Sequence, residues 1–229
     1  MKLAIIIPAF NEEGSIKDVL EKIPKTILGI GNIVPIVIDD GSVDRTYEIA
    51  TANTHYVAQH VVNLGLGAAL TTGFAAAQKL DCDIAVTLDG DGQHNPLDIE
   101  KLIKPIIDNK ADVVIGTRMT NTKHMPFVKV FGNWAMNVMT AIVMHAWSTD
   151  TQSGMRALGK KALATMTLHS VGYEISSEII GEARRSKLRL KEIPIETIYT
   201  DYSMAKGQSV LNAVNILTRL ITIRISGKK

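Results

Sequence analysis

Two aspartates separated by a single glycine, Asp89 and Asp91, follow directly after an apolar run. That run, residues 84–88, has the composition of a buried strand, so both carboxylates are expected at its carboxyl end. Gly90 has no side chain to obstruct a ligand there, and Gln93 adds a further oxygen. Hard cations such as Mg²⁺ take oxygen ligands, often one or two carboxylates together with substrate phosphates. The motif therefore indicates a metal and diphosphate site, although Asp-Gly-Asp also occurs in ordinary turns.

Polar residues also follow the first two apolar runs of the chain. Pro8 is expected to end the first run by stopping sheet pairing, and Asn11 and Glu12 then offer polar groups to a ligand. Asp39 and Asp40 follow the second run, where a carboxylate could accept hydrogen bonds from a base or a ribose. Each segment alone also suits a solvated turn or a helix cap. Their combination with the aspartate pair, at three strand ends, favours a binding site.

The elements that must position these residues alternate along the first half of the chain. Apolar runs predict strands over residues 3–7, 33–38, 56–62, 84–88 and 113–116. Helical patterns cover residues 16–23, 45–52, 68–80 and 96–107. Ser15 and Asp18 resemble a capping box for the first helix. The alternation predicts an α/β fold with a mostly parallel central sheet and helices on both faces, in which ligands bind at the carboxyl ends of strands.

The second half of the chain is less regular. We expect helices over residues 131–147, 160–167 and 174–187, a strand over 188–199 and a final amphipathic helix over 209–225. Trp134 and Trp147 near the ends of the first of these helices, and basic residues in the last, suit contact with a membrane surface, although both helices could instead pack on the core or in a homo-oligomer.

Composition limits the class of protein. A chain of 229 residues with 46% hydrophobic residues suits one domain with a large core. The net charge of +2 gives no reason to expect a nucleic-acid partner. The single cysteine, Cys82, excludes an internal disulfide and fits a reducing compartment. The apolar run at residues 3–7 is too short for a signal peptide, and no stretch is long enough to span a bilayer.

The succession of motifs resembles the family 2 glycosyltransferases of the GT-A, or nucleotide-diphospho-sugar transferase, fold. The matching segments are residues 8–13, 39–46, 63–67 and 89–94. Within that family the chain is most similar to the polyprenyl-phosphate sugar synthases, such as the dolichyl-phosphate mannose synthases. The resemblance implies a single domain, with residues 1–118 as the nucleotide-sugar half and 119–229 as the acceptor half. It also implies transfer of a sugar, with inversion, from a nucleotide diphosphate to a dolichyl or undecaprenyl phosphate.

The resemblance also implies roles for individual residues. Nucleotide-sugar contacts are expected from Pro8, Phe10, Asn11, Glu12, Ile38, Asp39, Asp40, Asp89, Gly90, Asp91 and Lys206. Mg²⁺ or Mn²⁺ would be held by Asp89, Asp91 and Gln93. The acceptor phosphate would meet Arg118, Lys129, Ser153 and Arg156, and Asp91 and Arg118 would be the catalytic residues. Arg156 could instead pair with a structural carboxylate, and Lys206 could be an ordinary solvated lysine.

The donor is indicated only by departures from the mannose-synthase pattern. Thr200 stands where those enzymes usually carry an arginine, and Lys129 stands where an arginine is common. The residues around Asp150 and Glu196 are closer to relatives that use UDP-glucose or UDP-N-acetylglucosamine. A UDP-sugar is therefore favoured over GDP-mannose. The expected location is the cytoplasmic face of the membrane, as a peripheral enzyme.

Several other features have less specific interpretations. Gly65 and Gly67 follow the third strand rather than the first, so they predict a tight turn before a close-packed helix and not a dinucleotide site. Glu174 and Glu178, four residues apart, are weaker candidates for acid–base or acceptor-side roles. The alternatives left open are a related enzyme acting on a soluble or polysaccharide acceptor, a nucleotidyltransferase, and a non-catalytic sugar-nucleotide-binding module.

Overall fold

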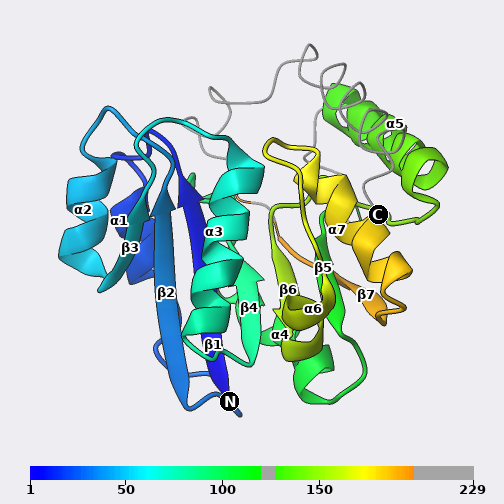
Figure 1. The fold of residues 1–229 in the computed structure, drawn as a ribbon, viewed down its shortest axis with the longest axis horizontal. Coiled ribbons are helices and arrows are strands. Elements are labelled where there is room, and N and C mark those ends of the chain that lie inside the picture. Colours follow the sequence, from blue (N-terminus) through cyan, green and yellow to red (C-terminus); the bar gives the residue numbers. More distant parts are fainter. Residues whose placement is uncertain (120–126, 197, 199–229) are drawn as a thin grey trace.

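The computed structural model describes residues 1–119, 127–196 and 198. Within those residues one seven-stranded sheet runs through the molecule in the order β3-β2-β1-β4-β6-β5-β7 (Figure 1). Its strands are β1 Lys2–Ala9, β2 Asn32–Asp39, β3 Tyr56–Gln59, β4 Ile84–Thr87, β5 Val113–Thr117, β6 Arg156–Gly159 and β7 Leu190–Pro194. All neighbouring pairs are parallel except those made by β6, which runs antiparallel to β4 and β5. The predicted α/β class and mostly parallel sheet are confirmed.

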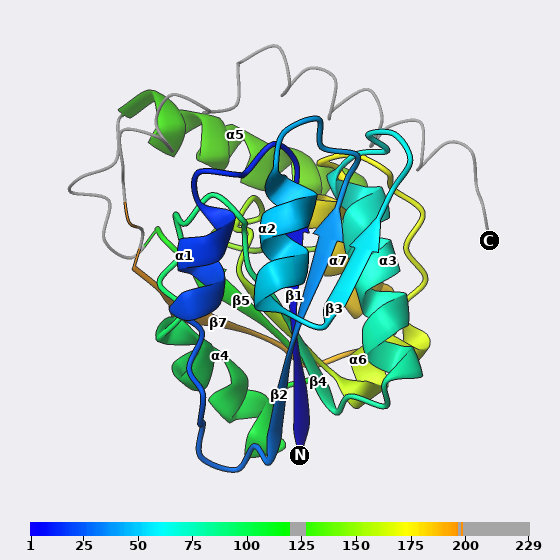
Figure 2. The same ribbon diagram turned by 90° about the vertical axis from the view of Figure 1, so that its left-hand side faces the viewer.

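Helices cover both faces of the sheet (Figure 2). They are α1 Ile16–Glu21, α2 Thr46–Asn53, α3 Leu66–Lys79, α4 Asp98–Ile107, α5 Phe127–Met144, α6 Lys160–Thr165 and α7 Ile175–Arg185. Residues of α1, α2 and α4 share one apolar core with one face of β1, whereas α3, α6 and α7 pack on the opposite face. Burial on both faces explains why the central strands read as continuous apolar runs.

The strand register brings the predicted polar segments together. Ala9 at the end of β1 pairs with Asp39 at the end of β2, and the Leu88 amide donates to the carbonyl of Ile6. The carboxyl ends of β1, β2 and β4 therefore lie side by side, and the segments that follow them start from one edge. We call this the carboxyl edge of the sheet.

Several predicted boundaries were wrong. Pro8 does not end the first strand: it pairs with Ile38 inside β1. It faces the side where β4 has already ended, so its missing N–H costs no ladder hydrogen bond. The expected capping box is also absent, because Ser15 makes no side-chain cap to α1. Strands β3 and β7 are shorter than expected, and the predicted helix over residues 209–225 lies outside the described residues.

Candidate active site

The loop after β1 is tied to the loop after β2. The Asn11 amide donates to Ser42 Oγ at 2.9 Å, and Asn11 Oδ1 accepts the Val43 amide at 3.0 Å. The Glu12 amide donates to Thr46 Oγ1 at 2.7 Å. Asn11 has φ 56°, in the left-handed region that asparagine tolerates better than most residues. The two loops therefore form one unit, with Phe10 left 42% exposed beside it.

Asp39 and Asp40, predicted to contact a base and ribose, are almost fully buried. Asp39 accepts a hydrogen bond from Gln59 Nε2 at 2.8 Å. Asp40 Oδ1 lies 2.7 Å from His60 Nδ1, and its Oδ2 accepts the Gly65 amide at 2.8 Å. These carboxylates hold the loops at the carboxyl edge together.

The neighbouring Ile38 is buried in the core, so only its backbone lies near this edge. The nucleotide contacts expected of Ile38, Asp39 and Asp40 stay predictions.

Asp89 and Asp91 lie at the same edge, just beyond β4. Asp89 Oδ2 is 3.1 Å from Nε2 of the buried His94. Asp91 Oδ1 accepts the Gln93 amide at 3.0 Å, and its Oδ2 accepts Gln93 Nε2 at 2.5 Å. Gln93 therefore orients Asp91, a role that its predicted place in the metal site did not anticipate.

The Glu12 loop is joined to this aspartate pair through Ser15. Its Oγ lies 2.8 Å from the Gly90 carbonyl oxygen and 2.9 Å from Glu12 Oε2. The serine that was expected to cap α1 instead connects the first and third polar segments. A Cβ at Gly90 would stand 3.1 Å from the Pro8 carbonyl oxygen, so the two strand ends approach closely.

The electrostatics of the aspartate pair suit a cation. Burial raises the pKa of Asp91 to about 6, and the nearby Asp89 carboxylate adds to that rise. Burial also disfavours the charged form of Asp89, but the hydrogen bond from His94 and the positive charges of Arg156 and Arg118 outweigh it and lower the pKa of Asp89. One carboxylate is thus held ionised while its neighbour resists ionisation. A divalent cation between them would remove the repulsion.

The donor set also limits which metal ion would fit here. In the described part of the chain, no group of three or more His, Cys, Asp or Glu side chains is arranged to hold a metal ion. Two carboxylates leave most positions around a cation to water or substrate oxygens, which suits Mg²⁺ or Mn²⁺ bound together with a diphosphate. The residues present therefore fit a cation that substrate helps to hold.

A buried cluster of charges lies behind the pair. Arg118 forms a bidentate ion pair with Asp150, through Nε at 2.8 Å and Nη2 at 2.7 Å, and its backbone amide also donates to that carboxylate. Asp150 is fully buried, while the Arg118 side chain is 20% exposed. The contact predicted between Arg118 and an acceptor phosphate would have to use the exposed part of this guanidinium group.

Two other residues predicted to meet the acceptor phosphate are buried. Arg156 is 1% exposed and Ser153 is 0% exposed, so neither presents a polar group at the surface of this structure. Arg156 Nη2 donates to the Thr151 carbonyl at 3.1 Å. Burial lowers the pKa of Arg156 to about 10, which leaves it cationic at neutral pH beside Asp89 and Asp150. This buried position favours a structural role for Arg156 over the predicted contact with the acceptor phosphate. The side chain of Lys129 and the whole of Lys206 lie outside the described residues.

Sequence reasoning missed the part that β6 plays. Thr87 Oγ1 donates to the Gly154 carbonyl at 2.6 Å and accepts the Arg156 amide at 3.2 Å. A Cβ at Gly154 would stand less than 3.0 Å from the Asp89 carboxyl group. The Ser-Gly segment before β6 is thus packed against a predicted metal ligand. Gly154 and the short spacing to Arg156 were visible in the sequence, but their contact with Asp89 was not.

Comparison with known proteins identifies the family. Residues 4–164 match the glycosyl transferase family 2 domain. The chain belongs to glycosyl transferase family 2. This confirms the expected enzyme class.

Three archaeal relatives illustrate the similarity. An uncharacterised protein of Methanocaldococcus jannaschii is 43% identical over 98% of this chain and 93% of that protein. A UDP-N-acetylglucosamine–dolichyl-phosphate N-acetylglucosaminyltransferase of Methanococcus voltae is 39% identical over 96% of this chain and 95% of that one. A dolichol-phosphate mannosyltransferase of Pyrococcus furiosus is 31% identical over 96% of this chain and 62% of that one.

A solved structure supports the fold. Glucosyl-3-phosphoglycerate synthase from Mycobacterium tuberculosis, crystallised with Mn²⁺, UDP and phosphoglyceric acid, superposes with a TM-score of 0.75 at 19% identity. The match covers 98% of this glycosyltransferase and 78% of that chain. At this identity the likeness establishes the shared GT-A fold.

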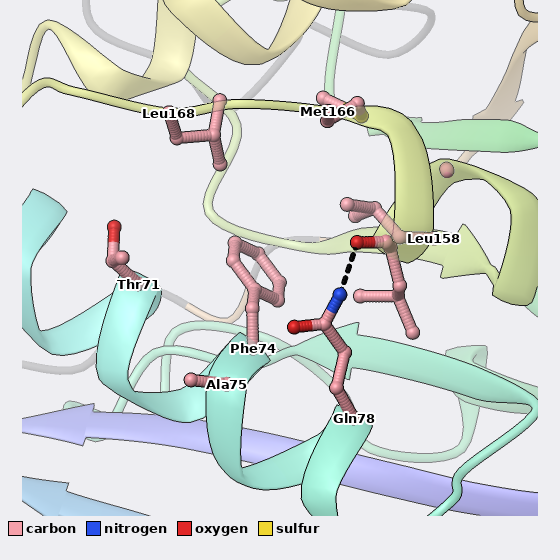
Figure 3. Close-up of a pocket in the computed structure, with 9 residues that line it drawn as sticks. Thr71, Phe74, Ala75, Gln78, Leu158, Met166 and Leu168 are labelled. Atoms are coloured by element: carbon pink, nitrogen blue, oxygen red, sulfur yellow. Dashed lines mark hydrogen bonds between the residues drawn. The ribbon is translucent and has the colours of Figure 1, made fainter.

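One apolar pocket lies away from the carboxyl edge. It opens between α3 and α6 and is lined by Phe74, Leu158 and Leu163 among others (Figure 3). Gln78 Nε2 donates to the Leu163 carbonyl across it. No residue predicted to serve the glycosyltransferase site lines this pocket, so the two are separate features. In the part of the glycosyltransferase that the structure describes, no helix is both long and apolar enough to cross a membrane.

Proposed function

We propose that this glycosyltransferase moves a sugar from a UDP-sugar to a polyprenyl phosphate, with inversion at the anomeric carbon and with Mg²⁺ or Mn²⁺. The observation that carries the proposal is the placement of Asp89 and Asp91 together at the carboxyl edge. The raised pKa of Asp91, about 6, supports this, because a bound cation would stabilise the ionised form of a carboxylate that burial and Asp89 disfavour. The printed names of similar proteins add support, since they include transferases acting on dolichyl and undecaprenyl phosphates.

Asp89 and Asp91 would hold the cation, and Gln93 and His94 would keep their carboxylates in place. The cation would act as a Lewis acid that stabilises the negative charge gained by the departing nucleoside diphosphate. The two joined loops, residues 10–13 and 42–46, border this edge and would contact the nucleotide. Phe10 is exposed there and could contact the ring of the base. Lys206, expected from the resemblance to contact the nucleotide sugar, would complete the donor site.

The acceptor chemistry explains why a general base is not required. A phosphate monoester oxygen is already anionic at neutral pH, so it attacks without first losing a proton. The two glutamates considered for acid–base work have other partners. Glu178 accepts the amides of His169 and Ser170, and Glu174 accepts the amide of Gly172. We assign the acceptor phosphate to Arg118 and Lys129.

A polyprenyl acceptor requires access to a membrane. Trp134 on α5 is 56% exposed, and its ring centroid lies 5.8 Å from that of Phe131. Trp147, beyond the end of α5, is 58% exposed. We propose that the enzyme lies at the cytoplasmic face as a peripheral protein and uses these aromatic residues at the interface. The division into a donor half, 1–118, and an acceptor half, 119–229, and assembly as a homo-oligomer stay predictions.

A donor and acceptor screen tests the proposal. Purified enzyme would be incubated with UDP-glucose, UDP-N-acetylglucosamine or GDP-mannose, polyprenyl phosphate in detergent, and Mg²⁺ or Mn²⁺. We expect a lipid-linked sugar from a UDP donor, with an inverted anomeric centre by NMR, and its loss in Asp91→Asn. Glycosylation of a soluble or polysaccharide acceptor with no lipid-linked product would contradict the proposal and favour the alternative enzyme of the same fold.

A further inference from the structure

The loop before α7 is held by two buried glutamates. Glu178 accepts the His169 amide at 2.9 Å and the Ser170 amide at 2.8 Å. Glu174 Oε1 accepts the Gly172 amide at 3.1 Å. Charged acceptors on backbone N–H groups make strong hydrogen bonds. The segment 169–173, which we call the glutamate-held loop, therefore has a defined shape although it is not a helix or a strand.

This loop is packed against the start of α3, at the Gly65 and Gly67 motif. The Val171 carbonyl accepts the Gly67 amide at 2.8 Å. A Cβ at Gly67 would stand less than 3.0 Å from the Ser170 carbonyl, and one at Gly65 less than 3.0 Å from the Val171 carbonyl. Gly65 also has φ +99°, which only glycine adopts readily. The two glycines thus leave space for the glutamate-held loop, a purpose that the sequence alone did not reveal.

The same contacts fix where the loop lies. Asp40, at the carboxyl end of β2, accepts the amides of Leu64 and Gly65. In both ribbon views the chain before α7 lies beside the end of α3 that is nearest the carboxyl edge (Figures 1 and 2). Hydrogen bonds therefore run from the sheet edge through Asp40 and the glycine turn to the glutamate-held loop. Tyr173, the last residue of this loop, is therefore placed at the carboxyl edge by these contacts.

The environment of Tyr173 agrees with this position. Tyr173 is 41% exposed, so it can be reached from solvent. Burial raises the pKa of Tyr173, and the carboxylates of Asp89, Asp91 and Glu12 raise it further. The phenol thus lies within electrostatic reach of these carboxylates and keeps its proton at neutral pH. A neutral O–H is well suited there, because a lysine or arginine would pair with the carboxylates that the cation needs.

We propose that Tyr173 contacts substrate and that its hydroxyl donates a hydrogen bond to a phosphate oxygen bound at the carboxyl edge. This inference rests on the proposed function of that edge. The phosphate belongs either to the donor diphosphate or to the polyprenyl acceptor, which present the same chemistry.

Tyr173→Phe removes only the hydroxyl and is the direct test. Tyr56→Phe is the matched control, because Tyr56 is also 41% exposed but lies on β3, the outermost strand of the sheet, two strands away from β1. Because the lost hydrogen bond would be to a charged oxygen, Tyr173→Phe should weaken the affinity for that substrate about tenfold or more. A weaker UDP affinity with Mg²⁺ present would assign the contact to the donor. An increase in KM for polyprenyl phosphate, with UDP affinity unchanged, would assign it to the acceptor.

A second measurement uses the unmutated enzyme. With ¹³C-labelled tyrosine, the Tyr173 ring signal should shift when UDP and Mg²⁺, or polyprenyl phosphate, are added, while the Tyr56 signal should not. Unchanged UDP affinity and unchanged acceptor KM in Tyr173→Phe would overturn the inference, as would equal losses in both variants. A wild-type enzyme that makes no lipid-linked sugar contradicts the proposed function instead, and Tyr173 is then judged by UDP affinity and the NMR shift.

Discussion

Gly154 lies directly against the carboxylate of Asp89, so that a Cβ at position 154 would stand less than 3.0 Å from both carboxyl oxygens and the carbon between them. The contact joins the segment before β6 to the end of β4, which are far apart in the sequence. Gly154 bounds the Asp89 carboxylate on one side, and His94 contacts it on another. A predicted metal ligand is thereby placed by a glycine with no functional group of its own.

Gly154→Ala should therefore weaken metal-dependent nucleotide binding. The added methyl group must displace the Asp89 carboxylate or the backbone, and we expect UDP affinity in the presence of Mn²⁺ to fall about tenfold or more. Isothermal titration measures it. Gly132→Ala is the control, since Gly132 is an exposed position of α5 and nothing lies within 4 Å of a Cβ there. Equal affinity in wild type and Gly154→Ala would show that Asp89 does not need this position.

Asp91→Asn should stabilise the metal-free protein at neutral pH. The pKa of Asp91 is raised from 3.8 to about 6, so the native state keeps this proton to higher pH than the unfolded chain does. The free energy of unfolding consequently falls as pH rises through that interval, and the cost is fully present above it. Removing the charge should recover about 1–2 kcal/mol at pH ~7.5 and little at pH ~4.

Urea unfolding of both proteins at the two pH values, with a chelator present, measures this difference. The same substitution should abolish transfer, so the variant separates stability from activity. A variant less stable than wild type at neutral pH would argue that Asp91 is not held in a repulsive site.

Asp112→Asn should destabilise the fold at neutral pH, and the effect should disappear at low pH. Asp112 accepts the Arg189 amide and Nε, at 2.8 and 3.0 Å, and so joins the starts of β5 and β7. Hydrogen bonds from Arg189 lower the pKa of Asp112 to about 2. The stabilisation is present above the unfolded value near 4 and is lost as pH falls toward 2.

Because Arg189 is half exposed, we expect a loss of only about 1 kcal/mol at neutral pH. Thermal unfolding from pH ~7 down to pH ~2 should show the wild-type and variant curves converging. Asp81→Asn, which removes a partner of the exposed Lys160, is the control and should change little. A constant difference across the whole pH range would contradict the ionic account.

Arg118→Ala should be destabilising as well as inactivating. It leaves the fully buried Asp150 carboxylate without its bidentate partner, although Arg156 still lies nearby. We expect a loss of about 2–3 kcal/mol of unfolding free energy. Arg185→Ala, which breaks a pair with Glu182 at the surface, should cost less than about 1 kcal/mol.

The double variant Arg118→Ala/Asp150→Asn should recover part of the stability lost in Arg118→Ala, because the unpaired charge is gone. Chemical denaturation of the three proteins forms the comparison. No recovery in the double variant would mean that the arginine stabilises the fold by packing rather than by its charge.

The parallel half of the sheet could be predicted because its signals are local. Strands β1, β2 and β4 are uninterrupted apolar runs, and each is followed by polar residues that mark its carboxyl end. Strand β6 was missed because it has four residues, starts with a charged one and pairs antiparallel in the middle of the sheet. The buried Arg156 side chain donates to the carbonyl of Thr151, five residues earlier, and lies near the carboxylates of Asp89 and Asp150, and this environment could not be read from the sequence.

The candidate site was predicted to a similar extent. The residue types at the carboxyl edge identified Asp89 and Asp91, whereas the contacts that hold them were not readable from spacing. Ser15 was taken for a helix cap but joins Glu12 to Gly90. Glu178 was considered for catalysis but accepts two backbone amides. In each case a local pattern suited two partners, and the tertiary structure selected the distant one.

The most direct test of the account is a crystal structure of the enzyme soaked with UDP and Mn²⁺. We expect an anomalous manganese peak at an ion bound by Asp89 and Asp91 and by the UDP diphosphate, with Tyr173 facing the same phosphates. UDP bound at the carboxyl edge with the ion elsewhere, or an ion that Asp89 and Asp91 do not contact, would contradict it.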